Sequence, residues 1–317
     1  MIRPPADSLL TSAAETFGTP LFLYDLDTVR ARQAGLAWAL PDVDVRYALK
    51  ANGSLAVCAA LAACGLGAEI CSDGELALAL EAGFDPARIV LGGPAKTDAT
   101  YAAALAAGVG MVVVESVTDA RRLDAAAGSR GRVQTVLLRI NPAAPPPRLG
   151  VPISGEASKF GVDEEGAADA LRQVAALPHL RLDGIHVFVE SSICDADVLV
   201  RMHRYTLDLA DRMRAEGIAV ETVNLGSGLG VPYHHGEAPL DLEHYAARMR
   251  EARAAASHPY GIVMEVGRYL VAESGVYLTR VLDVKRSRGQ TFAVVDGGIH
   301  NLYRRAMAHA NDLARVV

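Results

Sequence analysis

Short apolar runs rich in β-branched residues alternate along the chain with longer alanine-rich stretches, starting near residue 43. Runs of this kind, separated by turn residues such as Gly83, Gly108 and Gly217, are typical of buried strands, and the alanine-rich stretches are typical of helices. We predict eight strands: Val43–Leu49, Ala68–Cys71, Arg88–Gly92, Met111–Glu115, Val133–Ile140, Leu182–Phe188, Ala219–Leu225 and Gly261–Glu265. A helix-compatible segment follows each of the first seven, for instance Ser54–Cys64, Asp73–Ala82, Asp98–Ala107, Glu165–Ala176 and Asp197–Glu216.

The repeated strand-then-helix order predicts an α/β fold with a parallel sheet. No segment shows a dinucleotide fingerprint or a reversal of strand order, and this favours a closed (β/α)8 barrel over an open sheet. The long segment Asn141–Phe160, which contains Pro145 to Pro147, interrupts the rhythm after the fifth strand. Its irregularity predicts a binding or lid loop, although a plain solvated loop would look the same.

Strand-like segments also lie outside the barrel, at both ends of the chain. These are Pro20–Tyr24, Tyr269–Arg280 and Gln290–Asp296. We therefore predict a partial second β domain that draws on both ends. The predicted division is an N-terminal segment 1–27 contributing to the β domain, a barrel 28–268, and the start of an incomplete β domain 269–317.

Composition narrows the class of protein further. The net charge is -6 and no basic block offsets it, which argues against nucleic acid as a partner. No apolar run approaches membrane-spanning length, and the first ten residues have no apolar leader segment, so we expect a cytoplasmic protein without a membrane partner. The four cysteines show no metal-binding spacing and are expected to be reduced, mostly buried thiols. We expect no metal site.

Polar residues gather where the predicted strands end. Lys50 closes the first strand, Glu69 lies within the second, and Arg139 closes the fifth. Strands six to eight are followed or closed by further candidates: His186, Phe188, Glu190, Ser191, the loop GSGLG at Gly226–Gly230, and the segment Glu265–Arg268. Because the active sites of such barrels lie at the carboxyl ends of the strands, the whole set would face one rim.

Each of these residues alone has a structural interpretation. Lys50 could be a solvated strand end, His186 a satisfied core histidine, and Glu265 with Arg268 a surface ion pair. Together they favour one chemistry. A glycine loop lets backbone N–H groups approach a phosphate, and a lysine of lowered pKa can form a Schiff base with an aldehyde. A carboxylate can keep a pyridine nitrogen protonated, so the set indicates pyridoxal 5′-phosphate (PLP).

At this point the sequence resembles the fold-type III PLP-dependent amino-acid decarboxylases, the family of the diaminopimelate and ornithine decarboxylases. The resemblance is carried by motifs over most of the chain: PLFLYD (20–25), YALKAN (47–52), GLGAEICSDGEL (65–76), VLGGPAK (90–96), LRINP (138–142), SKFG (158–161), GIHVFVESS (184–192), GSGLGVPY (226–233), EVGRYLVAESG (265–275) and VVDGG (294–298). It implies an alanine racemase-like TIM barrel.

The resemblance also implies roles for individual residues. Lys50 would be the Schiff-base lysine, supported by Glu69, and Glu265 would pair with the pyridine nitrogen. Phe188 would stack on the ring where many relatives have a histidine, with His186 beside it and Arg139 near the ring hydroxyl. The phosphate would be held by Ser191, Gly226, Ser227 and Gly228, with Gly267 and Arg268. Arg268, Asp296 and Arg304 would contact substrate.

Two departures from the family pattern stand out. Glu190 occupies a position that is usually glycine, where its carboxylate would repel a phosphate unless it points away or pairs with a cation. In addition, the resemblance implies that relatives continue well past VVDGG with a cysteine that acts across the dimer interface and a tyrosine that touches the cofactor, whereas this sequence stops at Val317. We therefore expect a fragment or a shortened relative that binds PLP but decarboxylates poorly.

The implied reaction is decarboxylation of an α-amino acid, free or bound to a carrier protein, by a homodimer in amino-acid metabolism. Two alternatives remain open at this stage. A racemase would need a second base facing Lys50. A catalytically impaired relative that binds a partner would explain Glu190, but the retained Lys50, Glu265 and Arg268 speak against it.

Overall fold

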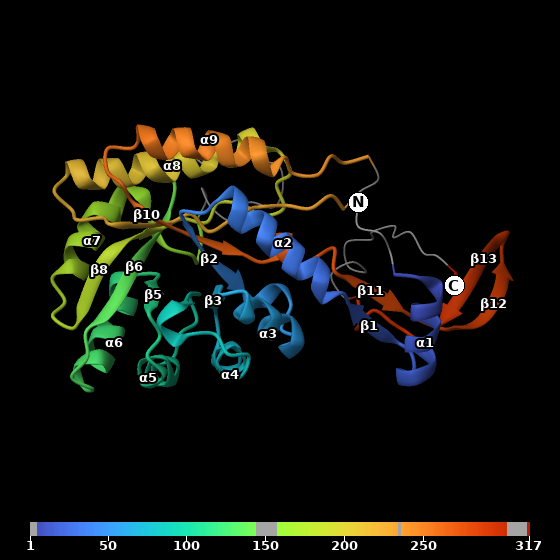
Figure 1. Ribbon diagram of the computed structural model, residues 1–317. Coiled ribbons are helices and arrows are strands. Elements are labelled where there is room, and N and C mark those ends of the chain that lie inside the picture. Colours follow the sequence, from blue (N-terminus) through green and yellow to red (C-terminus); the bar gives the residue numbers. More distant parts are fainter. Residues whose placement is uncertain (1–4, 144–156, 234–235, 303–315) are drawn as a thin grey trace. The chain divides into compact units, whose positions relative to one another are not determined.

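The computed structural model describes residues 5–143, 157–233, 236–302 and 316–317 (Figure 1). Residues 144–156 of the predicted lid loop therefore lie outside the described residues, as does Arg304. By its contacts the chain divides into two compact units, one formed by Val29–Ala272 and the other by Met1–Thr28 with Glu273–Val317.

The larger unit is a closed barrel of eight parallel strands, as predicted. The strands are β2 (Val43–Ala48), β3 (Gly67–Ile70), β4 (Ile89–Leu91), β5 (Met111–Val114), β6 (Gln134–Asn141), β8 (Leu180–His186), β9 (Thr222–Asn224) and β10 (Gly261–Val266). They follow one another in the order β5-β4-β3-β2-β10-β9-β8-β6, and pairing of β5 with β6 closes the ring. The short β7 (Val162–Asp163) pairs with the end of β6.

Helices cover the outside of the barrel (Figure 1). They are α2 (Leu26–Ala39), α3 (Leu55–Ala63), α4 (Asp73–Glu81), α5 (Asp98–Ala107), α6 (Val117–Gly128), α7 (Ala167–Ala175), α8 (Ala196–Ala215) and α9 (Leu242–Ala255). Side chains cap several of them: the Ser72 and Ser116 hydroxyls accept backbone N–H groups of α4 and α6, and Thr97 forms a capping box with Thr100. Each cap fixes the point at which a rim loop becomes a helix.

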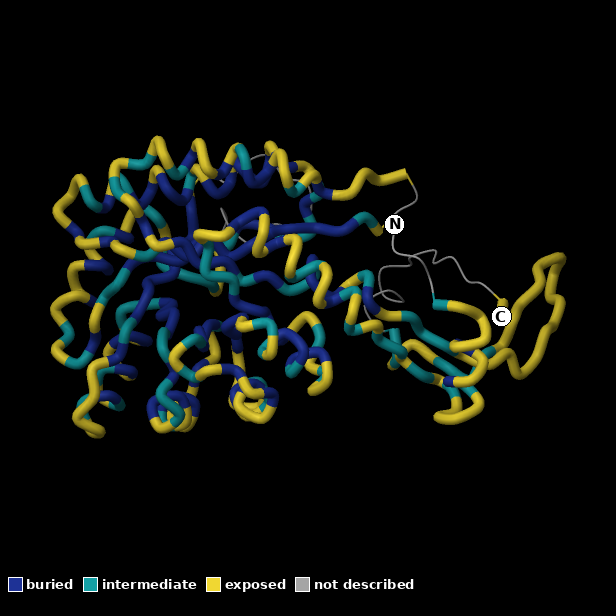
Figure 2. Tube along the Cα trace, viewed as in Figure 1, coloured by how far each residue is buried: buried dark blue, intermediate teal, exposed yellow. Residues whose placement is uncertain are grey.

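Burial explains why the barrel strands read as continuous apolar runs. Their side chains contact the barrel interior on one face and the helices on the other, so the strands are dark in Figure 2 while the outer faces of the helices are exposed. Val90, Val113 and Leu137 form one fully buried cluster from neighbouring strands. The charged rim residues therefore stand out against an apolar wall.

The smaller unit contains α1 (Asp7–Phe17), a sheet of β1 (Leu21–Tyr24) with β11 (Gly275–Leu278), and a hairpin of β12 (Val281–Ser287) with β13 (Gln290–Val295). The predicted strand over Tyr269–Arg280 is wrong in its first part, because residues 268–271 form the short helix α10 (Arg268–Val271). A run of apolar residues this short does not distinguish a buried helical turn from a strand.

Two other findings bear on the sequence predictions. None of the described helices is both long and apolar enough to cross a lipid bilayer. The cysteines differ from expectation, because only Cys58 is buried, while Cys64 and Cys194 are partly exposed and Cys71 is exposed at the rim. Cys71 follows β3 immediately, where the chain leaves the barrel wall, and this explains its exposure.

Candidate active site

Lys50 and Glu69 form an ion pair at the carboxyl ends of two neighbouring strands. Lys50 lies in a 3-10 turn just after β2, and parallel pairing sets Ala48 opposite Glu69 of β3. The Lys50 Nζ donates to Glu69 Oε2. The lysine side chain is 55% exposed, whereas that of Glu69 is 3% exposed. The pair thus joins a buried carboxylate to an amine that a small molecule can reach.

Glu265 lies on β10, the strand next to β2, and two polar neighbours hold its carboxylate. Asn224 Nδ2 at the end of β9 donates to Glu265 Oε1 at 2.7 Å, and His186 Nε2 at the end of β8 lies 3.5 Å from Glu265 Oε2. The strand register sets His186 opposite Asn224. Sequence reasoning missed Asn224, because it stands inside an apolar run that reads as a strand.

The surroundings of Glu265 and Glu69 shift the pKa values of the two carboxyl groups in opposite directions. Burial tends to raise the pKa of Glu265, but His186, Lys50 and the Asn224 amide together lower the pKa to about 2. The pKa of Glu69 is raised, first by burial and then by the charge of Glu265. Glu265 is therefore a fixed anion at neutral pH, while Glu69 is the carboxylate better able to take up a proton.

The Lys50 amine does not follow the sequence expectation. Partial desolvation lowers its pKa, but the nearby Glu69, Cys71 and Glu265 outweigh that effect, and the net pKa lies above the ordinary lysine value. Without a bound aldehyde Lys50 is thus a stable ammonium. It must pass a proton to a neighbour before it can act as a nucleophile.

The glycine loop lies against the segment that follows β8. Gly226 has φ 58° and Gly228 has φ 88°, in the left-handed region that favours glycine. A Cβ on Gly226 would lie 2.4 Å from the Phe188 ring, and one on Gly230 would lie 2.6 Å from the Ser192 backbone. The two segments are joined by hydrogen bonds between Ile193 and the backbone of Gly228 and Gly230, each 2.9 Å. Ser191 and the buried Glu190 lie within the segment that the loop contacts.

The first residues after β10 approach the lysine turn. A Cβ on Gly267 would lie 2.9 Å from Ala51 Cβ, so only glycine lets the two segments come this close. Arg268 follows at the start of α10, and its guanidinium lies 5.5 Å from the centre of the Tyr233 ring. Gly267 is therefore next to the turn that carries Lys50.

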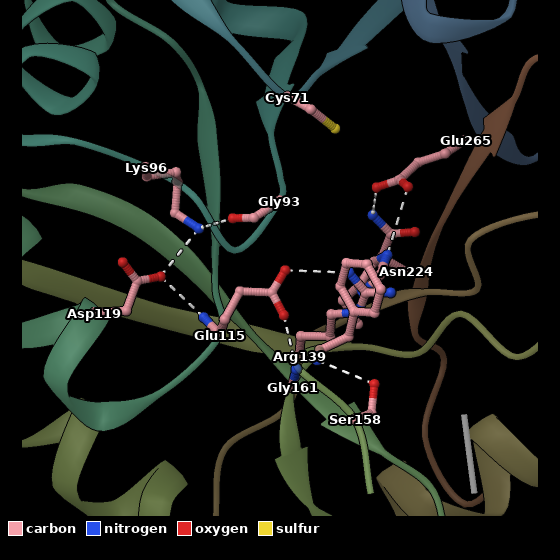
Figure 3. Close-up of polar contacts among 12 residues, drawn as sticks. Cys71, Gly93, Lys96, Glu115, Asp119, Arg139, Ser158, Gly161, Asn224 and Glu265 are labelled. Atoms are coloured by element: carbon pink, nitrogen blue, oxygen red, sulfur yellow. Dashed lines mark hydrogen bonds and ion pairs between the residues drawn. The ribbon is translucent and has the colours of Figure 1, made fainter. Parts of the chain in front are cut away.

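Arg139 belongs to a buried network on the far side of the rim (Figure 3). Its Nη1 donates to Glu115 Oε1 at 3.1 Å, and the backbone N–H of Gly161 donates to Glu115 Oε2 at 2.7 Å. The Arg139 guanidinium lies 4.3 Å from the centre of the Phe160 ring. Glu115 was placed at the end of a predicted strand but not recognised as a site residue. It fixes both Arg139 and the chain that follows the long loop.

Asp296 lies in the smaller unit. Its carboxylate accepts hydrogen bonds from Thr19, Thr279 and the backbone of Arg280. Its role in substrate contact stays a prediction, as does that of Arg304. The roles given to the barrel residues are likewise hypotheses that the geometry makes specific.

The residues present fit PLP. Glu265 is anionic at neutral pH, as a partner of a protonated pyridine nitrogen must be. The His186 Nδ1 atom is buried and has no hydrogen-bond partner among the described residues. The glycine loop packs so closely on the segment after β8 that a Cβ on Gly226 or Gly230 would overlap it. Its Ser227 and Gly228 N–H groups have no acceptor among the described residues and can therefore hold a phosphate. An amine, an anion and a cradle for a phosphate are thus available on one rim.

Comparison with known proteins agrees with this chemistry. Residues 26–272 match the family model described as pyridoxal-dependent decarboxylase, pyridoxal binding domain. The chain is 33% identical over 298 residues to an L-glutamyl-(BtrI acyl-carrier protein) decarboxylase of Niallia circulans, with 92% of this chain and 70% of that protein covered. It is 34% identical over 302 residues to a diaminopimelate decarboxylase of Neisseria meningitidis, with 94% and 73% covered.

Solved structures show the same fold. The diaminopimelate decarboxylase of Helicobacter pylori, complexed with L-lysine, superposes with a TM-score of 0.87 at 29% identity, covering 96% of this chain and 76% of that chain. The diaminopimelate decarboxylase from M. jannaschi gives a TM-score of 0.88 at 28% identity, covering 94% and 72%. The chain therefore belongs to the pyridoxal-dependent decarboxylase family, whose cofactor is pyridoxal 5′-phosphate.

Proposed function

We propose that this protein decarboxylates an α-amino acid, with Lys50 holding the PLP aldehyde carbon. The observation that carries the proposal is the meeting of Lys50, Glu69 and Glu265 on adjacent parallel strands, with one carboxylate fixed as an anion and the other able to take a proton. The bound cofactor supplies a pyridine ring that accepts the electron pair left at Cα when carbon dioxide departs.

The protein residues divide the remaining work. Glu69 is placed to take the proton from the Lys50 ammonium, because it already accepts that hydrogen bond and its pKa is raised. Glu265, fixed by Asn224 and anionic at neutral pH, would keep a proton on the pyridine nitrogen. Within the Gly226–Gly230 loop, the N–H groups of Ser227 and Gly228 would bind the phosphate. Phe188 packs against that loop at Gly226 and would be the residue to contact the ring.

The names of the relatives suggest two classes of amino-acid substrate. One similar protein is named for a carrier-protein-bound glutamyl substrate and others for diaminopimelate. We propose that the substrate is a free or carrier-bound α-amino acid and that the working form is a homodimer. Light scattering of the PLP-loaded protein tests the dimer.

The test of the reaction is carbon dioxide release by the PLP-loaded protein from a panel of free amino acids and a glutamyl-carrier conjugate. We expect release from at least one substrate, loss of that release in Lys50→Ala, and no change in the matched variant Lys285→Ala, which lies on the exposed strand β12. Exchange of the Cα proton without release of carbon dioxide would instead support the racemase alternative.

A further inference from the structure

A buried histidine lies directly behind the glycine loop. His203 is on α8, its side chain is 2% exposed, and both ring nitrogens have partners. Nε2 lies 2.8 Å from the Ser227 carbonyl oxygen, and Nδ1 lies 2.8 Å from the Tyr245 hydroxyl of α9. The imidazole thus connects two packed helices to the centre of the loop.

The two contacts determine which ring nitrogen carries the hydrogen. A carbonyl oxygen can only accept, so His203 Nε2 must be the N–H donor to Ser227. The ring is neutral, because burial lowers the pKa of His203 to about 4. Nδ1 is therefore the acceptor and the Tyr245 hydroxyl is the donor. Tyr245, itself fully buried, holds the ring in the form that donates to the loop.

The carbonyls of Gly226, Ser227 and Gly228 each accept a hydrogen bond from a residue outside the loop. The Gly226 carbonyl accepts the Glu265 N–H at 2.7 Å, and the Gly228 carbonyl accepts the Ile193 N–H at 2.9 Å. Ser227 is the residue between them, and its carbonyl is the one held by a side chain. The N–H groups of Ser227 and Gly228, in contrast, find no acceptor among the described residues. They remain available for an anion.

We propose that His203 is a positioning residue for the phosphate, acting through Ser227. By binding the Ser227 carbonyl it turns that oxygen away from the anion and leaves the N–H groups of Ser227 and Gly228 facing it. This inference rests on the proposed placement of the PLP phosphate at the Gly226–Gly230 loop. A carbonyl released from His203 would be free to turn toward the phosphate and repel it.

The experiment compares the dissociation constants of PLP and of pyridoxal, which lacks the phosphate, by equilibrium dialysis. His203→Leu removes the donor, and His203→Gln keeps an amide N–H in reach of the carbonyl. Thr206→Val is the matched control, because Thr206 is buried on the same helix and its hydroxyl donates to the Met202 carbonyl within that helix. Thermal unfolding of each variant reports any general loss of stability.

We expect His203→Leu to raise the PLP dissociation constant about tenfold and the pyridoxal constant by less than about twofold. His203→Gln should recover most of the PLP affinity, and Thr206→Val should change neither constant. An equal loss for both ligands in His203→Leu would overturn the inference, since a merely structural role predicts it. Wild-type protein without any preference for PLP over pyridoxal would overturn the phosphate site itself. If His203→Leu fails to fold, Tyr245→Phe takes its place, because loss of the Tyr245 donor weakens the same contact. A ratio of the PLP to the pyridoxal dissociation constant that equals the wild-type ratio in Tyr245→Phe would then overturn the inference.

Discussion

A buried ion pair between Lys96 and Asp119 supports the rim behind Glu115, and its removal gives a sharp stability prediction. The side chains of Lys96 and Asp119 are 1% and 9% exposed, and Nζ lies 3.0 Å from Oδ2. Lys96 also donates to the Gly93 carbonyl, and Asp119 accepts from the Glu115 N–H at 3.0 Å (Figure 3). The variant Lys96→Met leaves a buried carboxylate without its cation.

The size of the effect follows from burial. Breaking a buried pair by removing one partner costs about 3–5 kcal/mol, because the remaining charge is uncompensated. Asp119 keeps its hydrogen bonds from Tyr101 and from the Glu115 backbone, so we expect the lower end, about 3 kcal/mol. For a unit of this size that corresponds to a fall in melting temperature of about 6–12 °C.

Thermal and urea unfolding measure the change, with Arg122→Met as the matched control. Arg122 pairs with Asp98 between the neighbouring helices at 2.6 Å, but these side chains are 42% and 85% exposed. Such an exposed pair contributes little to stability, because water and salt screen it. The double variant Lys96→Met with Asp119→Leu should be more stable than the sum of its single changes predicts. A Lys96→Met effect no larger than that of Arg122→Met would refute the reasoning.

Three further predictions concern the rim. Gly230→Ala should destabilise the barrel by about 1–3 kcal/mol and weaken PLP binding, because the new Cβ meets the Ser192 backbone. The control Gly35→Ala on α2 has open space around the new Cβ and should do neither. Unfolding and PLP-binding measurements on both variants test this. Glu115→Ala should speed hydrogen exchange of the Gly161 amide while leaving the Leu137 amide slow; equal exchange at Gly161 in both proteins would contradict the contact. The folded pKa of Glu265 lies below the ordinary glutamate value of 4.5, so its ionised form stabilises the barrel above that pH, and the stabilisation is lost as the pH falls toward 2. Urea unfolding at about pH 5 and pH 3 should therefore show a loss on acidification that is about 2 kcal/mol smaller in Glu265→Gln than in the wild type, and equal losses would be inconsistent with the proposed charge.

The barrel could be predicted because its strands are buried on both sides. β2 to β6 and β8 to β10 therefore appear as apolar runs at a regular spacing, and the helices between them are rich in alanine. The turn residues after each strand also located the rim, which is why Lys50, Glu69 and Glu265 could be named beforehand. The helical turn at residues 268–271 could not be predicted, since packing rather than periodicity decides so short an apolar segment.

The sequence did not predict the residues that hold a site residue in place, Asn224 and His203. Asn224 stands within a strand pattern, and His203 stands within a helix pattern where a buried histidine reads as core. Their contacts with Glu265 and with the Ser227 carbonyl join segments that are far apart along the chain. The raised pKa of Lys50 likewise depends on carboxylates from two other strands. Only the folded register brings these groups together.

The most direct test of the account is to locate the covalent link to PLP. The chain has four lysines, Lys50, Lys96, Lys159 and Lys285, so borohydride reduction of the PLP-loaded protein followed by peptide mapping gives an unambiguous position. The account predicts the reduced cofactor on Lys50, and none on Lys50→Ala protein. Labelling of the buried Lys96, or cofactor bound without any attachment to Lys50, would contradict it.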